Sequence, residues 1–152
     1  VSLKNSNQGY FFKRKFYFLD KRINFSGLRT DKNLRLFKKE GAIYHGLVHE
    51  KVNIKNTGTF KNFLTHFSYT SHKHFKSKII YYNKLKALEK ITKGKKHSLV
   101  MEIFHPIYTF LNRYLFRLGI LDGKRGFIIC MVYSQGIRER YKEMRRLKKE
   151  QL

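Results

Sequence analysis

The stretch YFFKRKFYF, Tyr10 to Phe18, decides how the first half of this 152-residue chain folds. Bulky apolar residues alternate along it with basic and aromatic ones, which predicts a β-strand with one face against a core. The core face of this strand consists of Phe12, Phe16 and Phe18. The outer face consists of Phe11, Lys13, Lys15 and Tyr17.

Three segments downstream repeat the short, aromatic, alternating pattern of Tyr10–Phe18. Turn-forming residues separate them, as in the NTG sequence at Asn56–Gly58. We expect three further strands, at Asn33–Lys38, Ala42–Val52 and Thr59–Phe67.

After Ser71 the apolar residues recur at the period of a helix. Ser71 suits an N-cap, and the first helix is expected to run up to a stop at Gly94. A second helix is expected from about Leu99 to Leu118, entering or bending at Pro106. A third is expected over roughly Phe127 to Lys149.

This order of elements predicts an α/β fold: a short mixed β-sheet followed by about three C-terminal helices. Residues 1–70 form the strand-rich part and residues 71–152 the helical part of the same domain. The sheet has no helices of its own for its second face, which indicates part of a larger α/β or α+β domain. A start at Val rather than Met also favours a cut through a longer protein.

Charge and cysteine usage narrow the class of protein. With 34 basic and 10 acidic residues the formal net charge is +24, so an anionic partner is expected. The single cysteine, Cys130, excludes an internal disulfide and a multi-cysteine zinc site, and fits a reducing compartment. Because Cys130 lies in the apolar sequence FIICMVY, we expect a buried core thiol.

The sequence predicts no metal site in this chain. Its acidic residues form no Asp-x-Asp pair, and its glycines form no phosphate-binding loop after a strand. His66, His72 and His74 are close in sequence, but no cysteine or carboxylate nearby completes a ligand set.

Six short motifs follow one another in a characteristic order over nearly the whole chain. They are Arg14 in the aromatic strand, Arg35-Leu36-Phe37, Val48-His49-Glu50, His66-Phe67-Ser68-Tyr69, Tyr81-Tyr82 and Gly119-Ile120-Leu121-Asp122-Gly123. Together they resemble the C-terminal, acceptor-side half of a family 2 glycosyltransferase, of the kind that builds lipopolysaccharide cores and other cell-surface glycans.

The resemblance implies a partial GT-A-type domain and a sugar-transfer activity in the parent enzyme. That enzyme would move a sugar from a nucleotide-sugar donor to a lipid-linked or lipopolysaccharide-core acceptor, with Mg²⁺ or Mn²⁺ as cofactor. The metal-binding carboxylates and the donor site would lie upstream of the matched region. No cofactor is therefore expected in this chain, and the isolated chain is expected to be inactive.

Inverting sugar transfer needs a carboxylate that accepts the proton of the attacking hydroxyl. By the resemblance Glu50, beside His49, is the candidate catalytic base; alternatively, both residues form a polar strand end. Acceptor or phosphate groups would bind cationic side chains, and the candidates are Arg14, Arg35, Lys124 and Arg125.

Asp122 allows two interpretations. It could orient Lys124 or Arg125, or it could simply form an Asp-Gly turn, and the turn is favoured.

The sequence of the third helix predicts contact with a membrane. Its apolar start, Phe127–Tyr133, precedes a basic run from Arg138 to Lys149, an order that suits shallow insertion with basic residues at anionic headgroups. We therefore expect a cytoplasmic protein, peripheral at the inner face of the cytoplasmic membrane. The alternative is an ordinary C-terminal helix with a charged last turn.

Two other functions remain open. Aromatic residues interleaved with lysines are also typical of a basic RNA-binding module, although no RRM, KH or zinc-finger signature is present. The chain could also be an inactive remnant.

Overall fold

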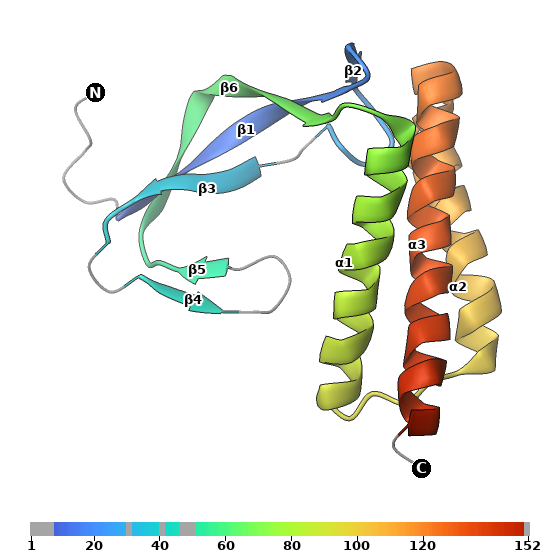
Figure 1. Ribbon diagram of the computed structural model, residues 1–152. Coiled ribbons are helices and arrows are strands. Elements are labelled where there is room, and N and C mark those ends of the chain that lie inside the picture. Colours follow the sequence, from blue (N-terminus) through green and yellow to red (C-terminus); the bar gives the residue numbers. More distant parts are fainter. Residues whose placement is uncertain (1–7, 30–31, 40–41, 46–50, 151–152) are drawn as a thin grey trace.

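The computed structural model describes residues 8–29, 32–39, 42–45 and 51–150, which form a mixed α/β structure of a sheet and a helical layer (Figure 1). The strands and helices, with two short helical turns labelled η, are β1 Gly9–Phe18, β2 Lys21–Ile23, β3 Lys32–Phe37, β4 Ile43–His45, β5 Lys51–Asn53, β6 Thr57–Tyr69, α1 His72–Thr92, α2 Leu99–Leu111, η1 Asn112–Phe116, η2 Gly119–Asp122 and α3 Gly123–Glu150.

The main sheet is built around β1, the aromatic strand that the sequence predicted. β1 pairs antiparallel with β2 and β3 and parallel with β6. The parallel ladder runs the whole length of β1, from Gly9 opposite Thr57 to Phe18 opposite Tyr69. The predicted mixed sheet is therefore confirmed, with the addition of the short strand β2.

The prediction of one strand over Ala42–Val52 is wrong. The segment contains two short strands, β4 and β5, which pair antiparallel with each other in a separate sheet. Ile43 lies opposite Asn53 and His45 opposite Lys51, so the two strands run in opposite directions and satisfy each other's backbone groups.

The sequence signals predicted the bounds of the first helix well and those of the other two helices less well. Ser71 caps α1, and its Oγ accepts a hydrogen bond from the backbone N–H of His74. The second helix does not continue to Leu118 as an α-helix, because a π-helical turn, η1, follows Leu111. Leu118 then takes a left-handed conformation, and α3 begins at Gly123, earlier than predicted.

The core lies between the sheet and the helices, on the predicted face of β1. Phe16 and Phe18 are buried, and the rings of Phe18 and Phe75 of α1 meet edge to face at 5.1 Å between centroids. From α3, Ile129 completes this cluster. Cys130 is buried as predicted, and burial raises the pKa of its thiol.

The helical layer is organised around α3, with α1 packed on one side of it and α2 on the other (Figure 1). Gly136 of α3 is where α1 comes nearest. A Cβ atom at Gly136 would lie 2.6 Å from Asn83 Nδ2 and 2.6 Å from Ile79 Cγ2. The absence of a side chain therefore sets the spacing of these two helices.

Candidate functional site

The catalytic pair predicted from the sequence, His49 and Glu50, lies outside the residues that the structure describes. The strands β4 and β5 precede and follow the segment that contains the pair. The roles of Glu50 as catalytic base and of His49 as its neighbour therefore stay predictions.

Two of the four candidate cations lie on the sheet. Arg14 of β1 lies against the side chain of Asn33 on β3, and its Nε donates to the Asn33 amide oxygen at 2.9 Å when that amide is oriented oxygen-inward. Arg35, also on β3, is exposed. Arg14 is thus hydrogen-bonded within the sheet, whereas the Arg35 side chain is exposed on the surface.

The other two candidate cations lie at the start of α3. Arg125 Nη2 donates to the backbone carbonyl of Leu19 at 3.2 Å. Arg125 and the exposed Lys124 line a pocket of about 270 Å³ with Leu19, His72 and Ile128. Two of the four candidate cations therefore lie on strands of the main sheet and two at the start of α3.

Asp122 holds two distant parts of the chain together. Its carboxylate accepts hydrogen bonds from the backbone N–H groups of Asn24 and Phe25 and from Ser26 Oγ, each at 3.0 Å. The interpretation of Asp122 as a turn residue without a further role is therefore incomplete, because its side chain fixes the loop after β2. Sequence reasoning missed this role because the partners lie almost a hundred residues upstream.

Neighbouring groups also hold the loop after β2 against η1, η2 and α3. Arg113 Nη1 donates to the Ser26 carbonyl at 2.7 Å, and its guanidinium stacks 3.8 Å from the ring centre of Tyr133. Gly126 packs directly on η2, because a Cβ there would lie 1.9 Å from the carbonyl oxygen of Gly119. The glycines of the sequence GILDGKRG therefore serve packing as well as turning.

The apolar start of α3 is part of the core. Ile129, Cys130 and Val132 are buried, so the predicted shallow insertion of Phe127–Tyr133 into a bilayer is wrong for these residues. The basic run that follows is partly neutralised: Arg146 pairs with Glu143 at 2.7 Å and also with Glu150. The apolar feature that predicted membrane contact by this helix is thus largely used in the core, and the basic run is partly paired on the surface.

An apolar surface lies instead on the outer side of α2. We call it the α2 apolar face; each of its side chains is between 42% and 62% exposed. Its members are Leu99, Val100, Ile103, Phe104, Ile107, Tyr108 and Leu111. Exposed apolar residues continue into η1 and η2, where Phe116 is the most exposed at 79%.

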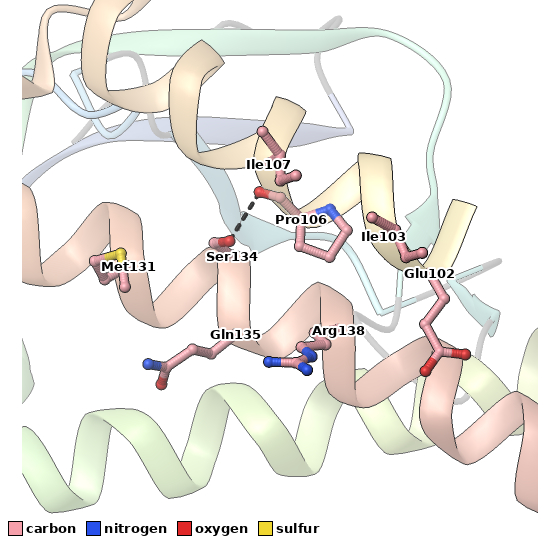
Figure 2. A pocket seen from close by; sticks show the side chains of 8 residues that line it. All are labelled: Glu102, Ile103, Pro106, Ile107, Met131, Ser134, Gln135 and Arg138. Carbon is pink, nitrogen blue, oxygen red and sulfur yellow. Dashed lines mark hydrogen bonds between the residues drawn. The ribbon is translucent and has the colours of Figure 1, made fainter. Parts of the chain in front are cut away.

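A groove of about 420 Å³ runs between α2 and α3 beside the α2 apolar face (Figure 2). Its apolar lining is Ile103, Pro106, Ile107 and Met131, and its polar lining is Glu102, Ser134, Gln135 and Arg138. Ser134 Oγ donates to the carbonyl of Pro106 at 2.8 Å, which ties the two helices across the groove.

The ionisable groups of α2 are turned inward and bonded there. Glu102 accepts from His97 Nε2 at 2.8 Å and pairs with Arg145 of α3 at 3.2 Å. His105 Nδ1 lies 3.0 Å from the Tyr141 hydroxyl. Partial burial, with Arg140 nearby, lowers the pKa of His105. The outer surface of α2 is thus left without charge.

No protein-family model matches this chain, and no solved structure is significantly similar to it. In the described part of the chain, no helix has both the length and the hydrophobicity to cross a bilayer. Nor do three or more His, Cys, Asp or Glu side chains gather there in a way that could hold a metal ion.

Proposed function

We propose that this chain is the acceptor-side part of a family 2 glycosyltransferase, with a partial GT-A-type domain. Its parent activity is transfer of a sugar from a nucleotide-sugar donor to a lipid-linked or lipopolysaccharide-core acceptor, at the inner face of the cytoplasmic membrane. One observation supports the proposal most. Three of the six motifs of the resemblance, although far apart in sequence, are connected through the main sheet and the loop that follows β2.

The connection involves both ends of the chain. The strand that ends in His66–Tyr69 lies parallel to the aromatic strand that contains Arg14. The Leu121-Asp122-Gly123 turn is bonded to the loop that follows β2. These three motifs, each a weak signal separately, are thus linked to one another in the fold, which supports the proposal.

The chemistry assigned to this chain concerns the acceptor. Glu50 would take the proton of the attacking hydroxyl, and exposed cations such as Arg35 and Lys124 would bind acidic groups of the acceptor. A divalent metal, when bound in the parent enzyme, neutralises the leaving diphosphate. By the resemblance, the carboxylates for that metal and the donor site belong to the other half of the parent domain.

An NMR titration of the ¹⁵N-labelled chain tests the proposal. The probes are a phosphorylated core oligosaccharide from lipopolysaccharide, UDP-glucose with Mn²⁺, and an oligo(U) RNA. We expect the oligosaccharide to shift amides near Glu50 and Lys124, and the nucleotide sugar to shift none. Lys124→Gln should weaken oligosaccharide binding, whereas the matched change Lys84→Gln on α1 should not. Micromolar binding of the nucleotide sugar, or no response to the oligosaccharide, would contradict the proposal.

A second candidate, RNA binding, is favoured by the outer face of the sheet. Lys15 Nζ lies 5.1 Å from the ring centre of Phe63, Lys32 Nζ lies 5.4 Å from that of Phe11, and Phe67 is 72% exposed. Open rings beside lysines suit base stacking with phosphate contacts. Salt-sensitive RNA binding that Phe67→Ala abolishes, with no response to the oligosaccharide, would establish this candidate. Binding of no probe would indicate an inactive remnant.

A further inference from the structure

Exposed apolar side chains are concentrated in one part of the molecule. Among the described residues, 13 of the 21 large apolar side chains that remain exposed lie between Leu99 and Leu121. They belong to α2, η1 and η2, except Leu118, which lies in the short link between η1 and η2. A contiguous apolar surface of this kind marks an interaction site, because isolated exposed apolar residues are ordinary but clusters are not.

The exposed charges that directly precede the α2 apolar face along the chain are basic. The acidic residues of this part of the chain, Glu102 and Asp122, are bonded within the protein. Two exposed basic residues, Lys95 and Lys96, directly precede α2 and form the basic rim of this face. An apolar centre with a basic rim is complementary to an anionic lipid surface, whereas a protein partner would need a matching acidic rim.

The dimensions of α2 fit a helix that lies in the plane of the membrane. Thirteen residues extend about 20 Å, which is shorter than the hydrocarbon core of a bilayer. The groove beside α2 also combines an apolar part with a basic one: Ile103, Ile107 and Met131 line the apolar part, and Arg138 lies at the polar part (Figure 2). A lipid is built in the same way, with an apolar acyl chain joined to an anionic headgroup.

We propose that the α2 apolar face docks into the interface of an anionic membrane, with the basic rim at the level of the phosphates. The docking surface is α2 with η1 and η2, and not the basic run of α3. The proposal stands independently of the glycosyltransferase assignment, because it needs only the apolar face and its rim. It places α2 beneath the headgroups and leaves α1 in water.

Vesicle sedimentation of the full chain tests the docking. The vesicles are pure phosphatidylcholine or phosphatidylcholine with phosphatidylglycerol. We expect binding to the anionic vesicles that weakens as salt rises, because the basic rim is screened. The double variant Phe104→Glu with Ile107→Glu should lower the binding constant at least tenfold. The matched pair Tyr81→Glu with Leu88→Glu, on exposed positions of α1, should change it less than twofold.

Two further measurements keep the test independent of folding and of other partners. Circular dichroism must show equal helix content in both double variants, since all four positions are exposed. Lys95→Glu with Lys96→Glu should reduce binding to anionic vesicles and leave the weak binding to neutral ones unchanged. Equal losses in the α1 and α2 variants, indifference of the chain to lipid charge, or a stable dimer that lipid does not dissociate would overturn the proposal.

Discussion

Helices α1 and α2 pack on opposite sides of the same helix, α3, yet their outer surfaces differ in kind (Figure 1). The exposed positions of α1 are mainly lysine, histidine and serine, with Tyr81 and Leu88 as its large apolar exceptions. The exposed positions of α2 are almost all apolar. Since both helices already bury one side on α3, the difference lies outside the core. The outer surface of α1 is polar, as suits contact with water, whereas that of α2 is apolar, which is the basis of the docking that we propose.

The inner sides of the two helices are more alike. Asn83 of α1 is buried, and its Oδ1 accepts from Arg140 Nη2 at 2.6 Å while its Nδ2 donates to the Ile79 carbonyl at 2.8 Å. On the α2 side, His105 meets Tyr141 of α3. Each contact thus combines apolar packing with a polar link, which fixes how the helices lie on α3.

The largest expected effect comes from the turn that leads from α2 into α3. Gly126→Ala would place a Cβ atom 1.9 Å from the Gly119 carbonyl oxygen, and a backbone atom cannot move aside cheaply. We expect a loss of about 3 kcal/mol or more in the free energy of unfolding, the upper end for overpacked positions. Urea denaturation measures it. An unchanged midpoint would show that η2 is not packed on α3 as described.

A smaller loss is expected where α1 meets α3. Gly136→Ala adds a Cβ atom 2.6 Å from Asn83 Nδ2 and Ile79 Cγ2, which opposes a helix-propensity gain of about 1 kcal/mol. The net loss should be about 1–2 kcal/mol. In the double variant with Ile79→Ala, the Gly136→Ala penalty should shrink, because the two positions are in contact. Additive losses in this double-mutant cycle would count against the close approach.

The smallest effect is a pH dependence on the α2 side. Because the pKa of His105 in the folded protein lies below its ordinary 6.5, the unfolded chain takes up this proton first as the pH falls. Stability should therefore decrease as the pH falls below about 6.5. The groups facing the ring are Tyr141, Arg140 and Lys90. In His105→Asn, urea midpoints between pH 7.5 and 5 should fall less steeply than in the wild type; equal slopes would contradict the shift.

Local patterns predicted the local parts of the fold. Alternation in Tyr10–Phe18 gave the direction of its core face, and the hydroxyl of Ser71 gave the start of α1, because both depend on neighbours in sequence. The β4–β5 pairing and the bonds of Asp122 involve partners far along the chain. No periodicity within a segment encodes such contacts.

The α2 apolar face shows a different limit of sequence reasoning. The charge order in α3 was the stronger signal, but Ile129 and its neighbours are in the core. The sequence LVMEIFHPIYTFL of α2 is apolar on more sides than a helix needs to pack on one neighbour, and this was the informative pattern. For the candidate base Glu50, the assignment still depends on the resemblance.

The most direct test of the central claim is the depth of one residue on each helix. The chain has no tryptophan, so Phe104→Trp on α2 and Tyr81→Trp on α1 each give a single reporter, at positions 62% and 60% exposed. With anionic vesicles, the Phe104→Trp emission should shift to shorter wavelength and be quenched by brominated acyl chains, while Tyr81→Trp should keep its water-exposed emission. Unchanged emission from both, or equal quenching of both, would contradict docking through α2.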